Sequence, residues 1–112
     1  MESACRALLD ALPQEIDPGV GRRAVEGTPT RVAAWGDPPV VLQCGVPAGS
    51  PTDPPVTVND LEWTVRDTGE GFLWSTVGLA TNVSVAIPGA YENGAELVNP
   101  LAAPVLQNLP AG

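Results

Sequence analysis

The sequence contains no histidine and no lysine, and these absences exclude much of the common enzyme chemistry. Without histidine there is no Ser-His or Cys-His pair and no imidazole metal ligand, and without lysine there is no Schiff base and no P-loop cation. The two cysteines lack the spacing of a zinc or thiol-redox motif. We therefore expect a protein that is not an enzyme, with no catalytic residue, cofactor or metal site.

Positive charge is also scarce, because five arginines stand against 13 acidic residues and the formal net charge is -8 at pH 7. A nucleic-acid binder needs clustered cations to displace the counterions of the phosphates. Nucleic acid is therefore not an expected partner. The same charge disfavours adhesion to an anionic bilayer surface.

Long apolar runs are missing as well. No stretch approaches the ~20 apolar residues that cross a bilayer, so we expect the domain itself not to be inserted in a membrane. No basic-then-apolar signal segment precedes the first helical pattern. We expect residues 1–112 to form a single extracytoplasmic domain, from which an export or anchoring segment has been removed.

Proline and glycine are abundant, with 13 and 12 residues, and this composition favours short strands and shaped loops over long helices. Helical spacing occurs only at the two ends of the chain. At the N-terminus, Ser3 is a candidate N-cap, Cys5, Leu8 and Leu12 share one helical face, and Pro13 ends the helix. Cys5 should therefore point inward with the leucines.

A second helical stripe lies near the C-terminus, where Leu97, Leu101 and Val105 recur at steps of four. Two prolines interrupt it. Pro100 suits the first turn of a helix, whereas Pro104 lies too deep for that start. We expect a short, bent helix.

Between these helices the sequence predicts strands separated by turns. Strand patterns cover residues 31–35, 40–44, 56–58, 61–66, 72–77 and 82–87, whereas 19–30 and 46–55 are predicted as loops. Asn59-Asp60 should form the tight turn of a hairpin, because both side chains tolerate a left-handed backbone. The expected fold is α+β, a mainly antiparallel sheet of about five strands packed with an N-terminal and a C-terminal helix.

The two cysteines, Cys5 and Cys44, allow three interpretations. They could form an intrachain disulfide, which fits their even number and inward positions in an exported chain. They could be two unpaired core thiols of a cytosolic protein. Alternatively, Ser3-Ala4-Cys5 could end a lipoprotein signal, which would leave Cys44 alone.

Acidic residues provide the first candidate site. Asp60 and Glu62 lie two residues apart on a predicted strand, and Asp67 and Glu70 flank the next turn, so a carboxylate-dependent hydrolase or a cation site can be imagined there. Acids at turns and strand edges are usually only solvated. Asp60 and Glu62 therefore stay candidates for a ligand or partner surface, with no catalytic role assigned.

Tryptophan provides the second candidate site. Trp35, Trp63 and Trp74 all lie in predicted strands, so the simplest interpretation places them in the core, with each indole N–H bonded to the backbone. The alternative is a ligand or partner groove lined by two of them.

Several motifs resemble one known family. Trp-Gly-Asp-Pro at residues 35–38 and Cys-Gly-Val-Pro at 44–47, with Cys-Arg-Ala-Leu-Leu at 5–9, are similar to an actinobacterial family of exported or membrane-anchored proteins of unknown function, DUF3515. The resemblance spans nearly the whole chain. It implies an N-terminal export or anchor segment, an envelope location and a bond between Cys5 and Cys44, and it implies no activity.

The function that we expect is a non-enzymatic cell-envelope module that binds a partner protein or an envelope component. The protein would be secreted or anchored at the outer face of the cytoplasmic membrane. The alternatives are a small-ligand carrier and a carboxylate-dependent hydrolase. An exposed patch of Trp and Leu would favour the binding module, and a deep pocket joining Asp60 and Glu62 would favour the hydrolase.

Overall fold

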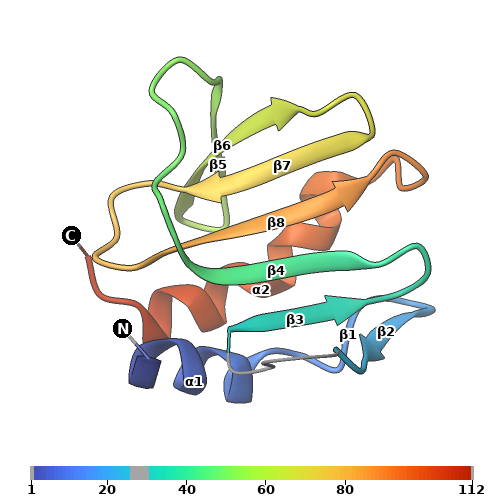
Figure 1. Ribbon diagram of the computed structural model, residues 1–112, viewed down its shortest axis with the longest axis horizontal. Helices are drawn as coiled ribbons and strands as arrows, with labels where there is room; N and C mark the ends of the chain where they lie inside the picture. The colour runs from blue at the N-terminus through green and yellow to red at the C-terminus, as the bar shows by residue number, and fades with distance from the viewer. Residues whose placement is uncertain (1, 26–30, 112) are drawn as a thin grey trace.

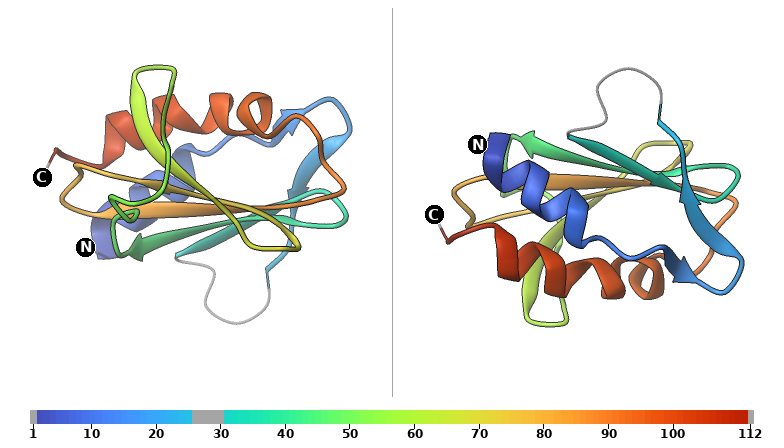
Figure 2. Two further views of the ribbon diagram at one scale, coloured as in Figure 1. Left: turned by 90° about the horizontal axis from the view of Figure 1, so that it is seen from above. Right: turned by 90° about the horizontal axis from the view of Figure 1, so that it is seen from below.

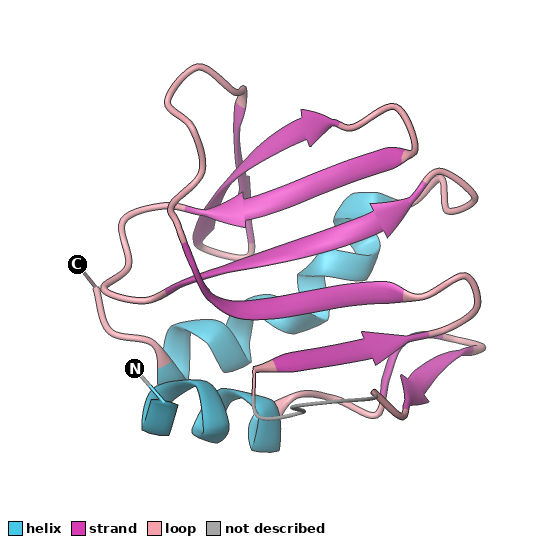
Figure 3. Cartoon of the chain, in the orientation of Figure 1, coloured by secondary structure: helices cyan, strands magenta, loops and turns pink. Residues whose placement is uncertain are grey.

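The computed structural model describes residues 2–25 and 31–111 and shows a twisted antiparallel sheet with α2 across one of its faces (Figures 1 and 3). The elements are α1 (Glu2–Ala11), β1 (Glu15–Asp17), β2 (Val20–Arg23), β3 (Val32–Trp35), β4 (Val40–Val46), β5 (Pro55–Val58), β6 (Leu61–Asp67), β7 (Gly71–Thr76), β8 (Asn82–Pro88) and α2 (Gly94–Asn108). The strand order is β1-β2-β3-β4-β8-β7-β6-β5. The predicted α+β class, with an antiparallel sheet and two terminal helices, is confirmed.

The predicted number of about five strands is wrong, because the sheet has eight. The missed strands are short: Glu15–Asp17 and Val20–Arg23 form a small hairpin around a turn in which Gly19 has φ +82°. Glu15–Asp17 has one apolar residue between two acids, and Val20–Arg23 continues with glycine and two arginines, so neither shows the apolar alternation that predicts a strand. The loop predicted for 19–30 is therefore wrong over Val20–Arg23, and its residues 26–30 lie outside the described part.

The predicted hairpin at Asn59-Asp60 is confirmed. Val58 pairs with Leu61, and the two turn residues have φ of 50° and 68°. A two-residue turn with both residues left-handed matches the twist of the strands that it joins. The position of Asp60 is therefore explained by its role in the turn between β5 and β6.

Both helices differ from their predicted starts. The N-terminal helix begins at Glu2, so Ser3 lies within it and is not the N-cap. The C-terminal helix begins at Gly94 and continues to Asn108, so Pro100 and Pro104 both lie in its interior. An interior proline costs about 3 kcal/mol in an isolated helix. Here the helix buries five side chains against the sheet, namely Leu97, Val98, Leu101, Ala102 and Val105, and this packing outweighs the propensity.

The sheet curls around α2, as the views along its edges show (Figure 2). Both edge strands, β1 and β5, contact this helix, and α1 packs beside it. The space between helix and sheet is filled by buried side chains that include Leu8, Leu42, Val85 and Leu101. None of the helices in the described residues is both long and apolar enough to cross a membrane.

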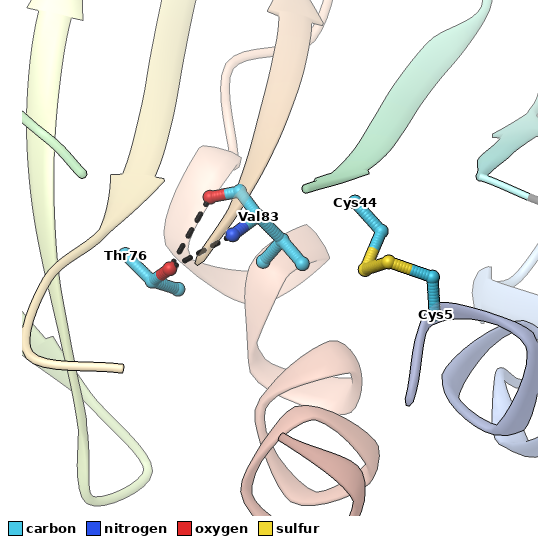
Figure 4. Close-up of a disulfide and its surroundings, with 4 residues drawn as sticks. All are labelled: Cys5, Cys44, Thr76 and Val83. Atoms are coloured by element: carbon cyan, nitrogen blue, oxygen red, sulfur yellow. Dashed lines mark hydrogen bonds between the residues drawn. A yellow bond between two sulfur atoms is a disulfide. The ribbon is translucent and has the colours of Figure 1, made fainter. Parts of the chain in front are cut away.

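Cys5 on α1 and Cys44 on β4 form a disulfide (Figure 4). Their Cα atoms lie 5.7 Å apart, the two residues are 39 apart in sequence, and both side chains are buried. The intrachain pairing is thus the one that the structure contains, rather than free thiols or a lipid-modified Cys5. The bond ties the N-terminal helix to the middle of the sheet.

Candidate functional site

Trp35 is a core residue. It is fully buried on β3, and its Nε1–H donates to the main-chain oxygen of Pro13 at 3.0 Å. The guanidinium carbon of Arg22 lies over the ring, 5.6 Å from its centroid. All of the polar capacity of this indole is used within the fold, so Trp35 has the structural role that was the simpler prediction.

Trp63 is also fully buried, but its Nε1–H has no hydrogen-bond partner among the described residues. Its ring meets that of Trp74 edge to face, with centroids 6.3 Å apart and an interplanar angle of 77°. Such pairs stabilise a core by about 0.5–1.5 kcal/mol beyond the area they bury. Trp63 therefore supports Trp74 from within the core.

Trp74 differs from both, because one side of it lines an open groove of about 430 Å³. The other lining residues are Val65, Phe72, Ile87, Gly89, Tyr91, Glu92, Gly94 and Ala95. We call this site the Trp74 groove. It contains the single phenylalanine and the single tyrosine of the chain. Of the three tryptophans it includes only Trp74, so the structure does not bring two of them to the same groove.

Strand register builds one wall of the Trp74 groove. Phe72 and Trp74 are two residues apart on β7, so their side chains project from the same face of the sheet. Trp74 pairs with Val65 and Val85, and Phe72 pairs with Ile87 on β8. Phe72 stays 47% exposed, whereas Trp74 is only 7% exposed. The exposure of this wall therefore increases from the buried indole of Trp74 to the accessible phenyl ring of Phe72.

The opposite wall is the turn that leads from β8 into α2. Tyr91 fixes it by donating its hydroxyl hydrogen to the main-chain oxygen of Pro38 at 2.7 Å. Asn93, at the N-cap of α2, donates from Nδ2 to the carboxylate of Asp17 at 3.4 Å. Because these contacts reach the turn before β4 and the end of β1, the wall is held in place before any ligand arrives.

Two kinds of unused hydrogen-bond donor lie at the inner end of the groove. The Nε1–H of Trp74 donates to no group in the described chain. Among the described residues, the only side-chain nitrogen or oxygen that is both enclosed and without a partner is Trp63 Nε1, so Trp74 Nε1 is accessible to solvent. The side chain of Asn93 makes no capping bond, so the first N–H groups of α2 are also free of a side-chain cap. Donors that open onto a groove can bond to water or to an acceptor of a ligand.

The predicted carboxylate candidates lie elsewhere. Asp60 and Glu62 are exposed, and neither lines the Trp74 groove. Asp67 is used locally, because its Oδ1 accepts the N–H of Gly69 at 2.8 Å. Within residues 2–25 and 31–111, no group of three or more acidic or sulfur side chains is placed to hold a metal ion. In this described part of the chain, Glu92 is the only charged side chain that lines the groove.

A second hollow of about 320 Å³ lies on the helix-free face of the sheet, under the loop that follows β4. Its two charged side chains, Arg66 and Asp53, and the hydroxyl of Ser50 already have partners. Arg66 Nη2 lies 3.1 Å from Asp53 Oδ2, and the hydroxyls of Ser50 and Thr52 are 2.8 Å apart. This hollow is therefore a weaker candidate than the Trp74 groove, whose donors are unused.

The fold and the groove together define a class: a disulfide-containing α+β domain with an aromatic-lined surface groove. The particular family follows from a family model described as "Protein of unknown function (DUF3515)", which matches residues 1–112. The chain belongs to that family, as its Trp-Gly-Asp-Pro and Cys-Gly-Val-Pro motifs predicted. No curated protein and no solved structure matches the chain.

Proposed function

We propose that the domain is a non-enzymatic, extracytoplasmic binding module of the cell envelope, and that the Trp74 groove receives a side chain of a partner protein. The observation that carries the proposal is the exposure of Phe72 beside Trp74 in a groove with unused donors. Exposed apolar surface combined with hydrogen-bond capacity is the usual composition of the core of a protein interface.

The disulfide supports the extracytoplasmic part of the proposal. Disulfides form and persist in oxidising compartments and are rare in the cytosol, where thiols are kept reduced. Cys5 and Cys44 pair within the core of the domain. The actinobacterial origin and the export or anchoring of the chain stay predictions that rest on the family resemblance.

A small-ligand carrier is the second candidate, because a groove of about 430 Å³ has the volume of many small-molecule sites. Such sites bury most of the ligand surface, however, and here Phe72 is 47% exposed. A partner side chain, which needs an open approach for the chain that carries it, fits this shape better. A carboxylate-dependent hydrolase gains no support from the groove, since only one carboxylate lines it.

Photo-crosslinking in the producing cell tests the proposal. Benzoylphenylalanine replaces Phe72 in one variant and Leu106 in another, and the full protein is irradiated in place. Leu106 is the matched control, because it is 43% exposed and does not line the groove. We expect a discrete adduct with a second protein from position 72 only. Equal adducts from both positions, or none from position 72, would contradict the proposal.

A further inference from the structure

We infer that the segment bound in the Trp74 groove carries an apolar side chain flanked by basic residues. This inference rests on the proposed function and specifies the chemistry of its partner. It combines three features of the groove: an apolar wall, an unused indole donor and a rim whose charge has one sign.

The apolar wall defines the first requirement. Val65, Phe72, Trp74 and Ile87 contribute side chains to one continuous surface of the groove. Phe72 is one of two large apolar side chains that the described residues expose, and the other, Leu106, lies outside the groove. An aromatic or branched side chain of the partner would cover Phe72 and remove both surfaces from water.

The donors at the inner end define the second requirement. Trp74 is 7% exposed, and its Nε1–H has no acceptor in the described chain. The start of α2 lies against it, because a Cβ on Gly94 would be 3.4 Å from Nε1. An extended segment can offer its main-chain carbonyl oxygen to this N–H while its side chain contacts Phe72.

The charge of the rim defines the third requirement. Among the residues that the structure describes, Glu92 is the only charged side chain lining the groove, and no arginine lines it. Glu96 lies in the first turn of α2, and Asp17 is held beside the N-cap by Asn93. The helix N-terminus alone would attract a negatively charged ligand, but these three carboxylates repel one. They favour lysine or arginine next to the apolar side chain.

The same charge disfavours a second copy of this chain as the occupant. Each copy brings a formal net charge of -8, because 13 acidic residues stand against five arginines. Steering by complementary charge requires an excess of the opposite sign. A basic segment of another envelope protein meets this requirement.

Three blocked tripeptides test the inference: acetyl-Lys-Phe-Lys-amide, acetyl-Glu-Phe-Glu-amide and acetyl-Lys-Ser-Lys-amide. Each is titrated at low salt into isotope-labelled protein, and the three indole N–H signals are followed by NMR. A Trp74→Phe variant assigns the Trp74 signal. We expect Lys-Phe-Lys to shift this signal saturably, and to bind roughly three- to tenfold more tightly than Glu-Phe-Glu, as exposed ion pairs allow. Lys-Ser-Lys should leave the signal in place.

Two further variants isolate the charge. Glu92→Gln should reduce the preference for Lys-Phe-Lys over Glu-Phe-Glu at least twofold, whereas Glu62→Gln, an exposed control that does not line the groove, should preserve it. Equal or tighter binding of Glu-Phe-Glu would overturn the inference about charge, while an adduct from position 72 would still support the proposed function. If no peptide shifts the Trp74 signal, the inference about partner chemistry is overturned. If position 72 also gives no adduct, the proposed function falls with it.

Discussion

Gly94, the first residue of α2, lies against the indole of Trp74, so that a Cβ atom at position 94 would be 3.4 Å from both Nε1 and Cζ2. The start of a helix thus meets a strand side chain at the inner end of the groove. A side chain at this point would contact the indole nitrogen, and glycine leaves that space open. The contact between Gly94 and Trp74 therefore makes the start of α2 part of the proposed recognition site.

Gly94→Ala should weaken ligand binding without weakening the fold. The added methyl group makes ordinary van der Waals contact with Trp74 and replaces glycine in a helix, so we expect stability to be unchanged or raised by up to about 1 kcal/mol. The methyl group also covers Nε1, so binding of acetyl-Lys-Phe-Lys-amide should weaken roughly fivefold or more. Thermal unfolding and the NMR titration measure the two effects.

Gly21→Ala is the matched control, because a Cβ there would meet only the main-chain oxygen of Gln14, at 3.9 Å, and the residue does not line the Trp74 groove. It should leave peptide binding unchanged. If Gly94→Ala binds the peptide as tightly as Gly21→Ala, the indole N–H is not part of the site.

Thr76→Val should destabilise the domain although it preserves shape. The buried Thr76 hydroxyl accepts the N–H of Val83 at 2.9 Å and donates to Asn82 Oδ1 at 2.9 Å (Figure 4 shows Thr76 and Val83). Valine leaves both groups without this partner, which costs about 1–3 kcal/mol. Urea unfolding measures the loss. Thr57→Val, at an exposed position of β5, should change stability by less than about 0.5 kcal/mol, and an equal loss in both variants would refute the assignment.

Removing the disulfide should cost much of the stability of the domain. Cys5 and Cys44 are 39 positions apart in the sequence, and closing a loop of this length contributes about 4 kcal/mol in the chain-entropy model. The double variant Cys5→Ala/Cys44→Ala, and the wild type under reducing conditions, should lose similar amounts in denaturant unfolding. A thiol-blocking reagent added at cell lysis should modify neither cysteine, because both are in the disulfide. Modification of both cysteines would contradict both the bond and the oxidising location.

Asp60→Gly should stabilise the hairpin or leave it unchanged. Asp60 has φ +68° in a two-residue turn, a conformation that glycine adopts without strain. We expect a gain of up to about 1 kcal/mol in thermal unfolding. The same variant examines the hydrolase alternative: loss of a hydrolytic activity in Asp60→Gly and in Glu62→Gln, with stability retained, would favour that alternative over a turn residue.

Local patterns in the sequence were sufficient for much of the fold. Alternation places Leu61, Trp63 and Val65 on the inner side of β6, and Asn59-Asp60 marks its hairpin because few residues accept a left-handed backbone. The pairing of Cys5 and Cys44 followed from their inward positions and the family resemblance. Each of these features depends on residues close in sequence or on a strong chemical constraint.

The rest depends on packing between distant segments. The helix from Gly94 continues through Pro100 and Pro104 because it is buried between the two edges of a curled sheet, which no local pattern reveals. The sequence predicts only part of the Trp74 groove, because the groove also depends on contacts between distant segments. Trp74 was a candidate, but Phe72 and Tyr91 join it through the register of β7 with β8 and the return of the chain into α2. The one local signal for Phe72 was its spacing of two residues from Trp74.

The most direct measurement of the central claim compares Phe72→Ser with Leu106→Ser in binding acetyl-Lys-Phe-Lys-amide. Both changes remove a large exposed apolar side chain, at 47% and 43% exposure, but only Phe72 lines the groove. Phe72→Ser should weaken binding roughly tenfold or more, and Leu106→Ser less than about twofold. If the two variants bind the peptide equally well, the Trp74 groove is not the recognition site.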